Sequence, residues 1–140
     1  MARAGLTVRR QVWECPDWRC SETVLLQGGE SRPAAANWYA PSCDVSGPLV
    51  TAETLNELAE ADTAGRIVLL SGALTQGDVA ARGSVVYYPE EHRRLNDLLD
   101  ARPPAAVIAV AMRVGSFRRV FSDARMFIPS VTVPAEVGEQ

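Results

Sequence analysis

Residues 66–70 carry the sequence Arg-Ile-Val-Leu-Leu, an apolar run that lies between Gly65 and Gly72. A short run that is continuously apolar and partly β-branched predicts a strand buried on both faces, as in a parallel sheet. A second such run, Ala-Ala-Val-Ile-Ala-Val-Ala, occupies residues 105–111, and a third lies at 128–133. We therefore predict three strands of one sheet in the C-terminal half of the chain.

The segment between the first two runs predicts a helix over residues 89–101. Pro89 suits the first helical position, and the two glutamates that follow it face the positive end of the helix dipole. One apolar face is formed by Leu95, Leu98 and Leu99. A strand, a helix and a strand in this order need a parallel crossover, so residues 66–133 are predicted to form the core of an α/β domain.

The N-terminal half predicts further strands. Apolar and polar residues alternate over residues 6–14, which indicates a half-buried strand, and residues 21–27 predict a second strand closed by Gly28-Gly29. We expect these two strands to pair around the loop between them. Residues 30–48 contain three prolines and are expected to be irregular.

Shorter elements complete the prediction. Residues 49–50 indicate a short strand, and Thr51 is the expected N-cap of an amphipathic helix over about 52–62. A further strand is predicted at 84–88, and residues 134–140 resemble a first helical turn. The expected fold is α/β, with a mixed sheet, a strand-helix-strand core and a β-rich N-terminal half.

Composition limits the function classes. The chain has 140 residues, with 14 Arg, 17 Asp plus Glu and a net charge of −3. This length is typical of one domain, 1–140, and the near-neutral charge predicts neither a nucleic-acid nor a membrane partner. No apolar stretch approaches the roughly 18 residues of a membrane span, and no signal peptide is visible, so we expect a soluble chain whose compartment is unknown. The abrupt ends suggest a domain excised from a longer protein.

The titratable residues do not form an obvious catalytic site. His92 is the single histidine, and its neighbours Glu90 and Glu91 cannot face one ion with it from a single helical turn. A zinc site usually needs three protein ligands, so a half-buried histidine near a helix start is the better interpretation. Asp97 and Asp100 are expected on a solvated helix face rather than as an acid–base pair.

The cysteines leave three alternatives open. Cys15 and Cys20 are separated by four residues, whereas metal knuckles and redox motifs normally have two, and Cys43 adds no evident fourth ligand. Free thiols, one disulfide or a zinc site remain possible. No nucleophile elbow or glycine-rich phosphate loop is present. We therefore predict no catalytic, cofactor-binding or metal-binding residue in this chain.

Aromatic residues are the better candidates for a functional surface. Trp38 and Tyr39, and again Tyr87 and Tyr88, lie beside proline-containing segments. Such side chains are enriched at interfaces but also serve as the edges of a core. Together with His92 they form the candidate contact surface.

Three motifs occur in an order that resembles the protease-associated domain family. Residues 64–70 are similar to a strand of the form Gly-Lys-Ile-Val-Leu-Val in that family. Residues 104–108 and 128–134 resemble its Ala-x-Ala-Val-Ile strand and its Ile-Pro-Ser-Val segment. The resemblance covers 49–138 closely and 6–48 loosely.

Two motifs are more specific. Residues 70–74 and 86–92 resemble the version inserted in bacterial di-zinc aminopeptidases, where a Leu-Leu-x-Gly strand precedes a Tyr-Asn-Pro-Glu-Glu-His helix start. The asparagine is missing here. The chain also ends at Gln140, whereas many of these domains continue into a short helix and a returning strand.

The resemblance implies a non-catalytic accessory domain of a zinc aminopeptidase. In such peptidases the zinc ligands lie outside the inserted domain, so no catalytic residue carries over, and Tyr87, Tyr88 and His92 are left with contact or packing. The implied partner is a catalytic peptidase domain in the same parent chain, with peptide substrate or another subunit as further partners. A freestanding protein- or peptide-interaction module and a small enzyme using His92 are the rival hypotheses.

Overall fold

A five-stranded sheet of order β3-β7-β6-β5-β4 organises the domain in the computed structural model, which describes residues 9–15, 17–112 and 118–138. Its parallel strands are β4 (Leu49–Ala52), β5 (Ile67–Leu70), β6 (Ala106–Val110) and β7 (Ser130–Val133). The short strand β3 (Ala35–Ala36) pairs antiparallel with β7 and makes the sheet mixed.

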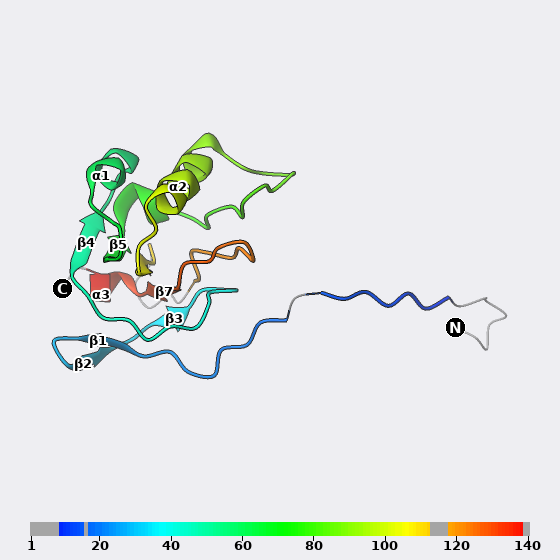
Figure 1. Cartoon of the computed structure of the whole chain (residues 1–140), viewed down its shortest axis with the longest axis horizontal. Coiled ribbons are helices and arrows are strands. Elements are labelled where there is room, and N and C mark those ends of the chain that lie inside the picture. The colour runs from blue at the N-terminus through cyan, green and yellow to red at the C-terminus, as the bar shows by residue number, and fades with distance from the viewer. Residues whose placement is uncertain (1–8, 16, 113–117, 139–140) are drawn as a thin grey trace.

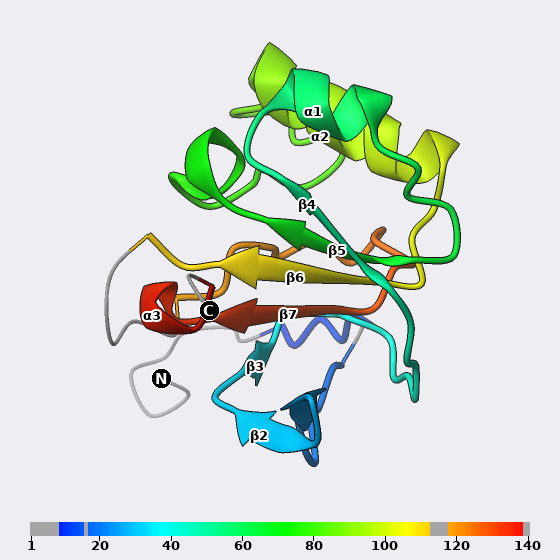
Figure 2. The ribbon, with the colours of Figure 1, turned by 90° about the vertical axis from the view of Figure 1, so that its left-hand side faces the viewer.

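The helices are α1 (Leu55–Glu60), η2 (Gly72–Thr75, a 3-10 helix), α2 (Glu90–Ala101) and α3 (Ala135–Gly138). Figure 2 shows α1 and α2 together along one side of the sheet. The parallel connections follow the chain, because α1 joins β4 to β5, and η2 and α2 join β5 to β6. The predicted strand-helix-strand core is confirmed, with each strand slightly shorter than its apolar run.

The two faces of the sheet are both buried, as the continuous apolar runs require. In β5, Val68 and Leu70 face the main core, which also holds buried residues of α1, α2 and the segment 120–128. Ile67 and Leu69 face the other side, where Leu25 and Val137 contribute to a smaller cluster. The alternation within one apolar run therefore supplies two separate cores.

The predicted strand at 6–14 is wrong over the residues that the structure describes. Residues 9–14 form no strand, are exposed, and extend away from the domain (Figure 1), while 6–8 lie outside the described residues. Of the predicted strand at 21–27, only β1 (Leu25–Gln27) forms, and its partner is β2 (Glu30–Arg32) rather than 6–14. The turn between them uses Gly28 and Gly29, both with positive φ, as two-residue hairpins favour.

Two further expectations need correction. Residues 84–88 form no strand but a loop, because this β-branched and aromatic run finds no neighbouring strand with which to pair. Thr51 belongs to β4, where parallel pairing with β5 keeps it extended, so α1 starts later than expected. Its N-cap is Thr54, whose Oγ1 accepts a hydrogen bond from Glu57 N at 3.2 Å.

Helix α2 and the C-terminal turn form where they were predicted. Pro89 is the N-cap residue of α2 and not its first helical residue as expected, since its ψ is extended and the helix begins at Glu90. Residues 135–138 form α3, whereas 139–140 lie outside the described residues. Across the part of the chain that the structure describes, no helix is both long and apolar enough to cross a membrane.

Candidate functional site

A pocket of about 490 Å³ opens beyond the carboxyl ends of β4 and β5. Open α/β sheets commonly bind ligands at this end, because the connections that leave parallel strands meet there. The lining comes from three segments that are distant in sequence: 54–56 at the start of α1, 73–77 in and after η2, and 91–95 in α2. The volume lies within the range of about 300–1,000 Å³ that is usual for small-molecule pockets.

Close contact between two connections fixes the floor of this pocket. Ala73 N donates to Glu53 O at 3.0 Å, and Ser71 N donates to Ala52 O at 3.1 Å. Gly72, between them, has φ +56°, and a Cβ added there would lie 2.9 Å from Glu53 Cβ. Only glycine therefore allows η2 to approach the start of α1 so closely.

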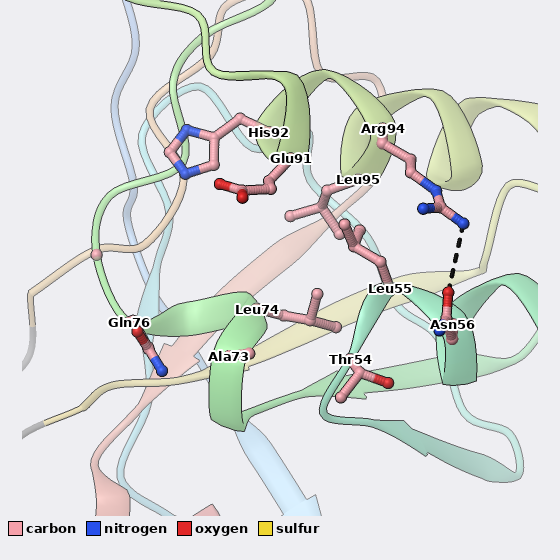
Figure 3. Close-up of a pocket in the computed structure, with 11 residues that line it drawn as sticks. Thr54, Leu55, Asn56, Ala73, Leu74, Gln76, Glu91, His92, Arg94 and Leu95 are labelled. Atoms are coloured by element: carbon pink, nitrogen blue, oxygen red, sulfur yellow. Dashed lines mark hydrogen bonds between the residues drawn. The ribbon is translucent and has the colours of Figure 1, made fainter.

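The floor is apolar and the rim is charged. Leu55, Leu74 and Leu95 point toward one another from α1, η2 and α2 (Figure 3). Two charged side chains of α2 lie on either side of Leu95: Glu91 toward the His92 end, and Arg94 toward Asn56, whose Oδ1 accepts from Arg94 Nη2 at 3.4 Å (Figure 3). The pocket thus combines an aliphatic surface with a negative and a positive group.

His92 closes one end of the pocket and is partly buried near the start of α2, as predicted. Ala80 N donates to its Nδ1 at 3.0 Å, so the neutral ring carries its proton on Nε2. The Tyr87 ring lies edge-on to the imidazole with 6.2 Å between ring centroids. Histidine and tyrosine therefore link the pocket to the loop that precedes α2.

That loop presents an apolar tip, which we define as Val85, Val86 and Tyr87. These side chains are 98%, 92% and 66% exposed. Three consecutive apolar residues exposed to this degree are unusual on an isolated soluble domain, whose exposed apolar residues are mostly scattered, and such a patch indicates an interaction surface. In Figure 1 this loop extends outward beyond the start of α2.

The stem of the loop is held by an ion-pair network around Arg82. Its guanidinium binds both carboxylate oxygens of Asp100 at 2.9 and 2.7 Å and Asp123 Oδ2 at 2.7 Å. Arg125 adds a hydrogen bond from its side chain to the Arg82 carbonyl. Asp97 and Asp100 are both exposed, as predicted, and Asp100 in addition joins α2 to the loop through Arg82.

Electrostatics favour the charged form of Asp123. Burial of its carboxyl acts to raise the pKa, but hydrogen bonds from Arg82 N and Arg125 N, together with the Arg82 guanidinium, outweigh it and lower the pKa. The Arg82 pKa is raised, because the two carboxylates outweigh the burial that would lower it. Arg82 and Asp123 therefore keep their charges at neutral pH.

The other side of the stem is held through α2. Asn96 Nδ2 donates to Ala80 O at 3.4 Å and to the Tyr88 hydroxyl at 3.3 Å. The Arg93 guanidinium lies over the Tyr88 ring, 5.6 Å from its centroid. Tyr88 thus packs at the base of the loop, while Tyr87 belongs to the exposed tip.

The predicted contact surface divides into two places. Trp38 and Tyr39 lie near the end of β3, where Trp38 contacts the Trp18 ring at 5.4 Å and Arg119 at 4.2 Å from its centroid. The segment around Phe121 separates this cluster from the stem of the loop, because Ser122 pairs with Trp38 and Phe121 with Val79. Trp38 and Tyr39 are thus grouped apart from Tyr87, Tyr88 and His92.

The cysteines are free thiols in the structure. Cys15, Cys20 and Cys43 are all exposed, and Cys20 and Cys43 line one pocket of about 210 Å³. Within residues 9–15, 17–112 and 118–138, no group of three or more His, Cys, Asp or Glu side chains is placed to hold a metal ion. Of the alternatives that the sequence left open, the structure has the unpaired thiols.

Sequence reasoning did not find most of the pocket. It singled out His92 and noted Leu95, but gave Thr54, Leu74 and Arg94 no binding role. These residues meet only through the parallel pairing of β4 with β5, and the expected strand at 49–50 was the one signal for that pairing. The sequence contained no pattern that joins the three lining segments.

The architecture defines a mixed α/β domain with a largely parallel five-stranded sheet. No protein-family model matches the chain, and no curated protein matches it in sequence. Its fold is similar to part of the aminopeptidase from Aneurinibacillus sp. strain AM-1, with a TM-score of 0.52 and 21% identity. The match covers 80% of this chain but only 24% of the aminopeptidase, so the likeness in fold is to one part of that protein.

Proposed function

We propose that this chain is a protease-associated domain of a zinc-dependent aminopeptidase and that it has no catalytic role of its own. The observation that carries the proposal is the fold likeness to a region that makes up 24% of an aminopeptidase. The motifs of the protease-associated family fall on β5, β6, β7 and the start of α2, which supports the same assignment. In this proposal the zinc ions and their ligands belong to a catalytic domain elsewhere in the parent protein.

The role of the domain is to shape substrate access or to make protein contacts beside that catalytic domain. Two features of the site support it. The apolar tip is exposed on a stem held by Arg82, so the backbone of the loop loses less freedom on contact than that of an unanchored loop would. The pocket next to the tip is open and combines apolar and charged groups, which suits peptide contact.

The proposal is tested first on the purified chain. We expect no turnover of an aminoacyl-nitroanilide in added zinc and no stoichiometric zinc by metal analysis, because a di-zinc centre needs several His and carboxylate ligands. Sequencing the flanking reading frame should then reveal a catalytic domain rich in His, Asp and Glu. Tightly bound zinc, or turnover abolished by His92→Ala, would instead support the small-enzyme hypothesis.

A freestanding interaction module is the second candidate, and the exposed apolar tip favours it. The flanking reading frame discriminates the two. If the natural protein has no catalytic domain, the interaction module replaces the accessory role, while the pocket and the tip keep their assignment as contact surfaces.

A further inference from the structure

We propose that the pocket between α1, η2 and α2 binds the free N-terminal residue of a peptide whose first side chain is aliphatic. The inference deepens the proposed function. It rests on that function for one point, the choice of peptides as the class of ligand. The recognised chemistry is an ammonium group, an aliphatic side chain and a carbonyl oxygen, in that arrangement.

The aliphatic side chain has a defined place. Leu55, Leu74 and Leu95 converge on the floor of the pocket (Figure 3), and Leu74 and Leu95 are themselves buried against the main core. Their positions are fixed from below, so a ligand side chain meets a preformed apolar surface. Such surfaces favour ligands that place an apolar group against them.

The charged groups set the orientation of the ligand. Glu91 is exposed at the rim, and within the described residues its carboxylate makes no hydrogen bond or ion pair. It is therefore available to an ammonium group. Arg94 has one long hydrogen bond, 3.4 Å to Asn56, and its guanidinium has further N–H donors for a carbonyl oxygen.

The order of these groups matches a peptide N-terminus. Glu91 and Arg94 lie on opposite sides of Leu95 (Figure 3), so the ammonium and the carbonyl bind at either side of the apolar floor. A free amino acid shares this chemistry, but its carboxylate would end the ligand at Arg94. The pocket, at about 490 Å³, is open and leaves space for the chain to continue. We therefore commit to a peptide.

Titration calorimetry of the full chain tests the chemistry with four ligands: Leu-Gly-Gly, its N-acetyl form, Gly-Gly-Gly and free leucine. We expect saturable binding of Leu-Gly-Gly, at least tenfold weaker binding of the acetylated peptide and of Gly-Gly-Gly, and weaker binding of free leucine, whose chain stops at Arg94. Equal affinity for the acetylated peptide would overturn the role of Glu91. Equal affinity for free leucine would overturn the assignment to peptides, and failure of all four ligands to bind at millimolar concentration would overturn the whole proposal.

Matched variants locate the site. Glu91→Gln and Arg94→Gln should each weaken Leu-Gly-Gly binding by about tenfold, since each removes a charge-assisted hydrogen bond. Glu90→Gln and Arg93→Gln change the adjacent residues, which do not line the pocket, and should leave the affinity within about twofold. An equal loss of affinity in the pocket variants and in the control variants would contradict the assignment. Thermal melts check that all four variants are folded.

This test is separate from that of the proposed function. Binding is measured on the chain itself and requires neither zinc nor hydrolysis. Binding without a catalytic domain in the reading frame would retain this inference and favour the freestanding module. A catalytic domain without any binding would overturn this inference alone.

Discussion

Arg82 has an influence on the loop before α2 that is large for a single side chain. Its side chain is 13% exposed, and that of Asp123 is 4% exposed, so this ion pair is largely removed from water. Removing the Arg82 side chain would leave the buried Asp123 carboxylate with backbone N–H donors alone, and the loss of the partner of a buried charge costs up to about 3–5 kcal/mol. The conformation of the apolar tip therefore depends on residues that do not belong to the tip.

The lowered pKa of Asp123 predicts an acid-sensitive contribution to stability. A carboxyl whose native pKa is depressed stabilises the fold above its ordinary value of 3.8, and this contribution is lost as the pH falls through the native pKa. Asp123→Asn should therefore lower the melting temperature at pH 7. The difference in melting temperature between the variant and the unmodified chain should become smaller below about pH 4, and thermal melts across this pH range measure it.

Asp97→Asn is the control for this prediction, because Asp97 is exposed on the same helix that carries Asp100. It should leave the melting temperature nearly unchanged at both pH values. If the difference in melting temperature between Asp123→Asn and the unmodified chain stays constant at acidic pH, then lost packing, rather than the lost charge, causes the destabilisation.

Among the elements, the connection after β5 places the strictest requirement on a residue type, because position 72 must be glycine. An alanine at position 72 would adopt φ +56° and place its Cβ against Glu53, whereas an alanine at Gly65 would have φ +68° with no atom within 4 Å. The left-handed conformation alone costs about 1–2 kcal/mol. Gly72→Ala should therefore destabilise the domain by more than Gly65→Ala, and the difference measures the close approach of η2 to the start of α1.

Denaturant unfolding of the two variants checks this expectation. Equal losses of unfolding free energy would show that Glu53 moves aside at little cost. Gly72→Ala should also weaken ligand binding in the pocket, because Leu74 follows two residues later on η2.

The elements that the sequence predicted correctly are strands whose burial can be inferred from one continuous apolar run. The apolar residues of β5 and β6 need both faces covered, and this requirement alone identifies central parallel strands. Residues 84–88 carry an equally β-branched and aromatic pattern, yet they form an exposed loop. Strand propensity describes how a residue fits a pleated, half-buried surface and cannot supply the neighbouring strand.

At the scale of the whole molecule, the site was harder to predict than the fold. The fold follows from short apolar runs, each readable within one segment. The pocket requires residues 54–56, 73–77 and 91–95 to meet, which depends on strand order and on the approach of two connections. The loop stem likewise joins Arg82 to Asp123, 41 residues away. Contacts between segments so distant in the sequence produce no periodic pattern from which they could be predicted.

Removal of the last strand should have a global effect. A chain ending at residue 129 lacks β7, which lies between β6 and β3 in the sheet order. We expect this truncated chain to lose cooperative unfolding, because Val107 to Val110 would lose their neighbouring strand and Val133 its place in the smaller core. Circular dichroism melts measure this, and a retained sharp transition would contradict it. A chain ending at residue 134 is the control and should unfold cooperatively.

The position of β7 also constrains the order of events during protein synthesis. Of the five strands of this sheet, the last to leave the ribosome is β7, an interior strand, and its neighbour β3 is the first of the five in the sequence. Ala35 pairs with Thr132, so β3 must wait until the residues up to β7 have been translated, about 5–20 s at 5–20 residues per second. Meanwhile the β4-α1-β5-α2-β6 unit can assemble from local contacts with one apolar edge, along β6, still open. Nascent chains of this protein would therefore depend on shielding of that edge, by chaperones or by neighbouring nascent domains, until β7 has been translated.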